Sequence, residues 1–359
     1  MSTAEKFTRK PEEDRWSLGQ SFDTTFRWEY EDGRDKLLNL YRKGKNLQWD
    51  SDERIDWSQS LGEENPAGLP DEVIGIYGSD LWNGMDEARR AELRRHFQAW
   101  QFSQFLHGEQ GALICTAKIV QQVPDMDSKF YASTQVVDEA RHVEAYSRLL
   151  HEKFDLVYPI NPHLASLLEE TLTDSRWDFT YLGMQVLIEG VALAAFGMIR
   201  DFGKNPLATS VTAYVMQDEA RHVAFGRLAL RDFYPQLTDK ERDEREEFVV
   251  EGCYLLRDRF LGEEVWETLG LPVAECMAAT DRSEFMRHYR SALFTRIVPT
   301  IKDIGLWGPR IRKAYEDMGI LGYADVSVEE LGDRDEEIAL QFDERRREVD
   351  RVAGLARAS

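Results

Sequence analysis

The sequence has no uninterrupted run of 18 apolar residues, so no membrane-spanning helix is predicted. Its first residues, Met1 to Trp16, are polar and charged and lack the apolar core of a secretory signal. Cysteine is rare: Cys115, Cys253 and Cys276 are scattered, which argues against a disulfide framework and against a CxxC metal site. Together these absences predict a protein of the reducing cytoplasm.

Positively charged residues are fewer than negatively charged ones. The chain has 45 Lys and Arg residues against 66 Asp and Glu residues, a formal net charge of −21. Such an acidic surface argues against nucleic acid and anionic membrane as main partners. Alternating runs of β-branched residues are scarce, so few strands are expected. With a hydrophobic fraction of 42% over 359 residues, the chain can still bury a substantial core.

What the sequence does contain is helical periodicity. Apolar residues recur at spacings of three and four in five long segments, about 86–122, 127–154, 177–202, 206–232 and 239–261. Further helices are expected around 282–318, and the charged stretch 325–359 is predicted to be a docked or frayed helix. We therefore predict an all-α protein with three parts: a loop-rich N-terminal arm (1–84), a helical bundle (85–262) and C-terminal helices packed on it (263–359).

One hexapeptide occurs twice. Asp138–Val143 (Asp-Glu-Ala-Arg-His-Val) recurs letter for letter, 80 residues later, as Asp218–Val223. In both copies the glutamate is preceded, 30 residues upstream, by another glutamate in a largely apolar setting, Glu109 and Glu189 respectively. The chain thus holds two copies of one arrangement, Glu…Glu-x-x-His.

Turn signals lie midway within each copy. Pro124 is the midpoint between Glu109 and Glu139, and Lys204, inside a Gly-Lys-Asn-Pro breaker, is the midpoint of the second pair. If each helix extends about 15 residues, roughly 22 Å, from the turn to its glutamate, the two glutamates of a pair lie at the same height along antiparallel helices. Two such hairpins make a four-helix bundle, joined by an extended linker of about 19 residues through the 159–162 region.

The repeated residues suit a pair of metal ions. Glu139 and His142 are three residues apart, so they share one face of a helix, and the second copy repeats this. Iron and manganese accept mixed carboxylate and imidazole ligands, and four carboxylates balance two divalent ions. An unpaired Glu189 inside its apolar helix would be costly to bury. The alternative, a solvated Glu-x-x-His pattern on a charged helix, fits one copy better than two.

Over about residues 100–232 these motifs resemble the ferritin-like di-iron carboxylate superfamily. It includes the bacterial multicomponent monooxygenases, the soluble acyl-carrier-protein desaturases and the radical-generating small subunit of ribonucleotide reductase. The resemblance implies two iron ions with some glutamates bridging, one on Glu109, Glu139 and His142 and the other on Glu189, Glu219 and His222. A mixed manganese–iron pair would use the same ligands.

The same resemblance implies roles for the neighbouring charges. Asp138 and Asp218 would accept hydrogen bonds from the ligand histidines, often across the site, because the second N–H of a ligating imidazole must be oriented. Arg141 and Arg221 would neutralise these aspartates. The alternative is a solvated charge pair.

The two halves differ beside the predicted site. Tyr146, four residues after His142, is similar in spacing to the radical tyrosine of the reductase small subunit, although a packing aromatic is the alternative. Trp49 suggests an electron-transfer path, and Gly226, the counterpart of Tyr146, is expected to leave more space. Small and apolar residues near the glutamates outline either a substrate pocket or ordinary packing: Ala112, Leu113, Ala192, Leu193 and Ala195.

At two places the sequence departs from the patterns of particular di-iron families, which narrows the choice among them. Val215 stands where the di-iron arylamine N-oxygenases carry an additional histidine, which argues against a close N-oxygenase match. Ala112 and Met184 stand where the ligand-binding oxidases similar to the reductase small subunit form a Val–Tyr crosslink, so that crosslink cannot form. The segment 43–58, in contrast, is similar to the N-terminal arm of that broader group.

The leading hypothesis is an O₂-activating di-iron oxidoreductase that hydroxylates, N-oxygenates or desaturates a small organic substrate. Turnover would need two electrons, which suggests a ferredoxin or flavin reductase as donor, and the resemblance suggests a homodimer. Two alternatives stay open: a radical-generating subunit, and a ferritin-like protein of iron storage or peroxide detoxification. The long arm and the C-terminal helices argue against the last of these.

Overall fold

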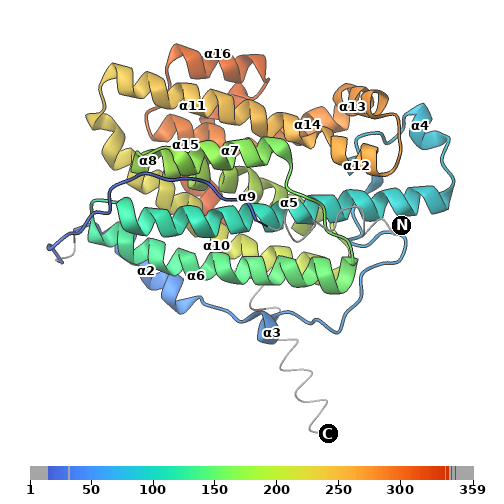
Figure 1. Ribbon diagram of the computed structural model, residues 1–359, viewed down its shortest axis with the longest axis horizontal. Coiled ribbons are helices and arrows are strands. Elements are labelled where there is room, and N and C mark those ends of the chain that lie inside the picture. The colour runs from blue at the N-terminus through green and yellow to red at the C-terminus, as the bar shows by residue number, and fades with distance from the viewer. Residues whose placement is uncertain (1–14, 31–32, 336, 339–340, 342–343, 345–359) are drawn as a thin grey trace, which may run out of the picture.

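The structure is a computed structural model that describes residues 15–30, 33–335, 337–338, 341 and 344. No strand occurs in this described part, which is built from helices (Figure 1). The predicted all-α helical bundle is confirmed. The predicted segments at Met1–Asp14 and in most of 336–359 lie outside the described residues, whereas 328–335 is helical.

Two helical hairpins form the core. The first joins α5 (Glu87–Gln122) to α6 (Met126–Arg148), which continues as the π-helical segment η3 (Leu149–Phe154). In the second hairpin, the first helix is nearly continuous and consists of α8 (Trp177–Tyr181), the π-helical segment η4 (Leu182–Ile188) and α9 (Glu189–Phe202). It is joined to α10 (Pro206–Phe233). In Figure 1 these long helices run side by side across the molecule.

Both hairpin turns form where the sequence predicted them. Asp125 caps α6 by accepting a hydrogen bond from the Ser128 backbone N–H, directly after Pro124. Asn205 caps α10 in the same way, accepting from Ala208 N–H, and Pro206 occupies the first helical position. Local capping chemistry therefore fixes the lengths of the helices that carry the repeat.

The sequence predicted an extended linker between the hairpins, and this prediction was wrong. The linker contains α7 (Pro162–Thr173), which Asn161 caps through two backbone N–H groups. The helix packs closely on η4: a Cβ at Gly183 would lie 2.1 Å from Thr171 Oγ1. Helix α7 was not among the predicted helical segments.

The remaining helices surround the core. The N-terminal arm contributes α2 (Asp35–Asn46), α3 (Ser51–Arg54), η2 (Asp71–Val73) and α4 (Asp80–Asn83). The C-terminal part contributes α11 (Asp239–Asp258), η6 (Arg259–Leu261), α12 (Glu263–Thr268), α13 (Val273–Arg282), α14 (Glu284–Ala292), α15 (Ile297–Asp303) and α16 (Pro309–Asp317). Short 3-10 turns lie at η5 (Tyr234–Gln236) and η7 (Leu321–Asp325). Helices α12 and α13 were not predicted.

One described helical stretch, Trp177–Phe202, is long and apolar enough by composition to cross a membrane. It is interrupted by Asp178 and Glu189, and 78% of its most apolar window is buried inside the protein. Such burial is typical of the central helix of a bundle.

Candidate metal centre

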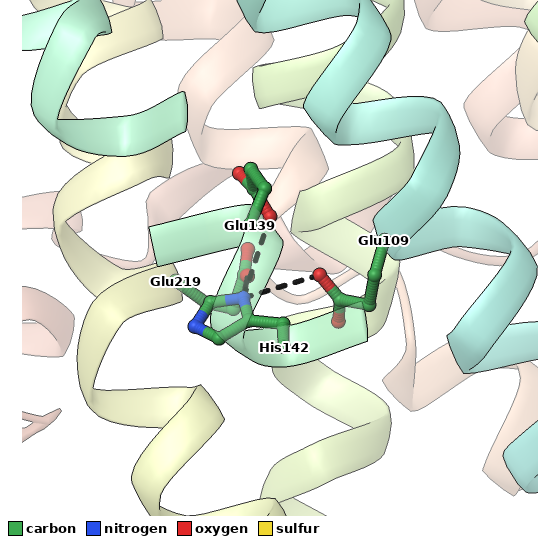
Figure 2. Close-up of side chains that lie close together, drawn as sticks. All are labelled: Glu109, Glu139, His142 and Glu219. Carbon is green, nitrogen blue, oxygen red and sulfur yellow. Dashed lines mark hydrogen bonds and ion pairs between the residues drawn. The ribbon is translucent and has the colours of Figure 1, made fainter. Parts of the chain in front are cut away.

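The two hairpins bring all six predicted ligands to one level of the bundle. Figure 2 shows Glu109 from α5, Glu139 and His142 from α6 and Glu219 from α10 pointing toward a common centre. Glu189 begins α9, directly after the π-helical segment η4, and faces the same centre. Because π-helical turns shift the register of a helix, η4 helps to set the face on which Glu189 lies.

His142 contacts three carboxylates through one ring nitrogen. Its Nδ1 lies 3.2 Å from Glu109 Oε2, 3.3 Å from Glu139 Oε2 and 3.1 Å from Glu219 Oε1. These four side chains offer ligand atoms that all lie within 4.8 Å of one another. They form one group that could hold a metal ion.

A second group shares a residue with the first. Glu139, Glu189 and His222 also place ligand atoms within 4.8 Å of one another, and His222 Nδ1 lies 3.1 Å from Glu139 Oε1. Glu139 therefore stands between the two groups, where a bridging ligand would stand. Glu219 Oε1 lies near both imidazoles, 3.1 Å from His142 Nδ1 and 3.5 Å from His222 Nδ1.

The residues fit a pair of bound metal ions. All six residues are at most 5% exposed. Five of their polar atoms lack a hydrogen-bond partner among the described residues: Glu139 Oε2, Glu189 Oε2, Glu219 Oε1 and Oε2, and His222 Nδ1. Buried carboxylate atoms without partners are expensive, so their convergence points to cations that complete them.

Crowding perturbs the carboxyl groups of the centre. Burial, reinforced by the charge of Glu219, raises the pKa of Glu109 well above its usual range. The same two causes raise the pKa of Glu189. Burial also acts to raise the pKa of Glu139, but the neighbouring imidazoles outweigh it and hold that pKa low. Protonation of Glu109 and Glu189 thus reduces the negative charge that is crowded in the centre.

The aspartates of the repeat exchange partners across the centre. His142 Nε2 lies 3.1 Å from Asp218 Oδ2, and His222 Nε2 lies 3.3 Å from Asp138 Oδ2. Each imidazole can thus donate from Nε2 to the aspartate of the opposite repeat while Nδ1 faces the centre. Such an outer hydrogen bond fixes the tautomer and the orientation of a ligating histidine.

Both repeat arginines lie against these aspartates. Arg141 contacts Asp138 and lies 3.2 Å from Asp218, while Arg221 contacts Asp218 and lies 3.6 Å from Asp138. The four side chains form one buried network of two positive and two negative charges. This is not a solvated surface pair.

Two residues of the N-terminal arm complete this surrounding layer and were not predicted to do so. Gln48 donates to Asp138 at 2.8 Å, and the Trp49 indole N–H donates to Asp218 at 2.8 Å. Trp49 also stacks on His142 with ring centroids 6.3 Å apart. The arm segment was recognised, but only the tertiary structure shows that two adjacent arm residues each reach a different aspartate.

Gln135 was also missed. Its side-chain amide donates to Glu139 Oε1 and to Glu189 Oε1, both at 2.9 Å. It lies four residues before Glu139, one turn away on α6, so its helical spacing from a ligand was the available signal. The amide ties together two carboxylates from different hairpins.

Tyr146 is fully buried among aromatic rings. Its ring centroid lies 5.7 Å from that of Phe105 and 6.0 Å from that of Phe196. Burial and the charge of Glu109 raise the pKa of its phenol well above 10. Tyr146 is therefore both a packing aromatic and a neighbour of the centre.

The space beside the centre is small. A cavity of about 20 Å³ is lined by Glu109, Glu189 and Glu219 together with Ala112 and Ala192. Leu113, Leu193 and Ala195 are not among its lining residues.

The expectation that Gly226 leaves open space was wrong. A Cβ at this position would lie 2.5 Å from Gln185 Cβ. The glycine thus allows close approach of α10 to η4, and the volume that Tyr146 fills in the first half is filled by Gln185 in the second.

A family model described as p-aminobenzoate N-oxygenase AurF matches residues 31–305. The match includes every residue of the six-ligand centre and Val215, which is fully buried. The match to the N-oxygenase family model thus holds although Val215, which argued against a close N-oxygenase match, supplies no further histidine. Among curated proteins, no sequence relative matches this chain.

Several solved structures are similar to this chain. A protein with aldehyde deformylating oxidase activity from Synechococcus is 16% identical, with 65% of this chain and 100% of that one covered and a TM-score of 0.44. A variant of an R2-like ligand-binding oxidase with an anaerobically reconstituted Mn/Fe cofactor is 17% identical, with 76% and 94% covered and a TM-score of 0.48. Another variant of that oxidase, aerobically reconstituted, is 17% identical over the same shares with a TM-score of 0.47.

Proposed function

Because this chain belongs to the p-aminobenzoate N-oxygenase AurF family, and is thus an O₂-dependent di-iron oxidoreductase, we propose that it oxygenates an organic substrate at the six-residue centre. The observation that carries the proposal is the convergence of five buried ligand atoms that lack a hydrogen bond, from three helices. N-oxygenation of an amine is the reaction that the family description favours, with carbon hydroxylation and desaturation as alternatives.

The ligands are proposed residue by residue. Glu109, His142 and Glu219 would hold one iron and Glu189 with His222 the other, with Glu139 shared between them. Val215 offers no further nitrogen, so the chain's own set is four carboxylates and two imidazoles. When bound, the iron pair supplies Lewis acidity and the redox equivalents for O₂ chemistry.

The protein's contribution is to position the metal ligands. Asp138 and Asp218 hold the imidazoles in the tautomer that presents Nδ1 to the centre, and Gln135 fixes two carboxylates. The cavity of about 20 Å³ beside the glutamates leaves room on the order of one water-sized molecule.

Metal analysis and O₂ uptake test this proposal. The wild-type protein, loaded with iron(II) and reduced, should bind two metal ions per chain and consume O₂. Glu139→Ala and His222→Ala should lose metal and O₂ uptake together, because each removes a ligand. Glu144→Ala, an exposed residue on the same helix, is the matched control and should behave as wild type. Full metal content in Glu139→Ala would overturn the ligand assignment.

A radical-generating role is the second candidate, favoured by the burial of Tyr146 beside Glu109. Low-temperature electron paramagnetic resonance after addition of iron(II) and O₂ separates the two. A tyrosyl signal that Tyr146→Phe abolishes would support the radical role, and its absence would leave the oxygenase.

The setting of the enzyme is part of the proposal. All three cysteines are free and buried, which is compatible with a reducing cytoplasm. A ferredoxin or flavin reductase would supply two electrons per turnover, and the chain would form a homodimer. Reduction of the iron-loaded protein by a ferredoxin and its reductase, and light scattering, test these two points; a large cage would instead favour the ferritin-like alternative.

A further inference from the structure

A cavity of about 510 Å³ lies on the outer side of α10. Four α10 residues that line it are three or four positions apart and so share one face of the helix: Gln217, Ala220, Arg221 and Ala224. The ligands Glu219 and His222 lie on another face of α10, toward the metal centre. The cavity and the centre are therefore separated by one helix, which is about 10–12 Å across with its side chains.

The charges around this cavity are sorted onto two walls. The first, the cationic wall, is built from α2, α9, α10 and the start of α15, and its described lining residues include no acid but four cations: Lys43, Arg221, Arg227 and Arg296. The second wall is the helical segment 328–335, which supplies all the described acidic residues of the lining: Glu329, Asp333 and Asp335. The charge of the cationic wall is opposite to the net charge of the chain, −21.

Two ion pairs join segment 328–335 to the cationic wall. Arg227 Nη1 lies 2.8 Å from Glu329 Oε1, and Arg296 Nη2 lies 2.8 Å from Asp335 Oδ1. The Glu329 side chain is 63% exposed, so its ion pair contributes little in water. Asp335 is buried, and its Oδ2 has no hydrogen bond among the described residues. The segment is thus attached across the cavity by charge and does not fill it.

Arg221 connects the cationic wall to the metal centre. Its guanidinium contacts Asp218 and lies 3.6 Å from Asp138 Oδ2. These aspartates in turn contact the imidazoles of His142 and His222. A molecule that contacts Arg221 in the cavity is therefore separated from a ligating imidazole by two side chains, an arginine and an aspartate.

Segment 328–335 shows what the cationic wall accepts, which is a short helix that carries carboxylates. A second protein with carboxylates on its surface could pair with Arg227 and Arg296 in the same way once the segment moves aside. A basic partner would be repelled by this wall. The proposed oxygenase needs two electrons per turnover, so a one-electron carrier must deliver twice, and each delivery oxidises one carrier.

We infer that an acidic electron-carrier protein docks on the cationic wall, and that segment 328–335 covers this wall until the carrier displaces it. Opposite charges across an interface speed association and fix the orientation of the partners. The wall directs the carrier to the side of α10 where Arg221 leads to both aspartates. The inference rests on the proposed oxygenase function and names the partner class and its docking surface.

Binding of an oxidised, acidic plant-type ferredoxin tests the docking surface without turnover. We would titrate it into the full-length, manganese(II)-loaded protein by calorimetry. Its affinity should fall by roughly tenfold between about 0.01 M and 0.1 M salt, because the Debye length shortens from about 30 to about 10 Å. Lys43→Glu should weaken binding by roughly tenfold, since it reverses a charge of the wall. Lys45→Glu, on the same helix but outside the lining, makes the same change in net charge and should have little effect.

The covering segment has its own matched pair of variants. Glu329→Gln removes one of the two ion pairs that attach the segment, so the ferredoxin should bind roughly two- to fivefold more tightly. Glu330→Gln removes the neighbouring exposed carboxylate, which does not line the cavity, and should leave the affinity unchanged. Reduction of the iron-loaded protein by reduced ferredoxin should follow the same order of variants.

Three results would overturn the inference. They are a ferredoxin that binds neither the wild type nor Glu329→Gln, equal losses of affinity in Lys43→Glu and Lys45→Glu, and an affinity that Glu329→Gln leaves unchanged or lowers. Metal content, and O₂ uptake after reduction by dithionite, are measured on the same samples. A wild type that binds two metals and consumes O₂ with dithionite but does not bind ferredoxin contradicts only this inference. A wild type that fails with dithionite as well contradicts the proposed function.

Discussion

Asp218 lies beside Glu219 in the second copy of the repeat, yet its carboxylate contacts the imidazole of His142 in the first copy, at 3.1 Å. The same Oδ2 atom accepts the indole N–H of Trp49 at 2.8 Å. Each half of the centre is thus oriented by the other half and by the N-terminal arm. This crossed arrangement makes the two predicted metal positions mutually dependent.

Replacing Asp218 by Asn should weaken metal binding by about 10–100-fold, the usual effect of losing an outer partner of a ligating histidine. Asparagine keeps the shape but removes the charge that favours a donating Nε2–H. Competition for manganese(II) against a chelator would measure the change, with Asp201→Asn, an exposed residue of α9, as control. Equal affinities in the wild type and Asp218→Asn would contradict the orienting role.

Gln135→Leu should impair one metal position more than the other. The amide donates to Glu139 and Glu189, which both belong to the group around His222. Leucine fills a similar volume but leaves two carboxylate oxygens without a donor, so binding of the second ion should weaken first. Metal titration should then show stoichiometry falling from two toward one, whereas Gln110→Leu, at an exposed position of α5, should keep two.

Metal loading should release protons, and metal affinity should fall as the pH falls. Burial raises the pKa of Glu109 and of Glu189, so in the metal-free protein these carboxyls are protonated at pH values where free glutamate is ionised. Each must lose its proton before it binds a cation, and protons compete more strongly at lower pH. Calorimetric titration of manganese(II) in buffers of different ionisation enthalpy would count the protons. A heat independent of the buffer would show that these groups are already ionised.

Asp178→Ala should destabilise the fold by roughly 3–5 kcal/mol, the usual cost of leaving one member of a buried ion pair alone. Asp178 on α8 accepts from Arg245 on α11 at 2.9 and 3.1 Å, and the two residues are 2% and 3% exposed. Urea unfolding of the metal-free protein would measure the loss. The double variant with Arg245→Leu should recover part of it, because no charge is then left unpaired; a double variant less stable than the single one would refute this.

Much of the candidate centre could be predicted from the sequence because helical spacing is local. Glu139 and His142 share a helix face through a separation of three residues, and turns at Pro124 and Lys204 make the glutamates level. The structure keeps these relations. Spacing did not show that Glu219 lies near both imidazoles, because the side-chain direction across a bundle depends on packing between helices.

The features missed were those that depend on distant chain segments. Gln48 and Trp49 reach the aspartates from about 90 and 169 residues away, and segment 328–335 faces Arg221 across a cavity. The space expected at Gly226 was filled by Gln185, from another helix. Each of these contacts is set by how whole helices pack.

The sequence by itself determined that this chain is a helical bundle with four carboxylates and two imidazoles at one level, because periodicity, caps and turns act over a few residues. Only the tertiary structure decided that Glu139 stands between both groups, that the aspartates cross, and that the acidic segment 328–335 faces a cationic wall. The burial of a charged group and its pairing with an opposite charge depend on tertiary packing. Both are set by every neighbour that surrounds the group, wherever in the chain that neighbour lies.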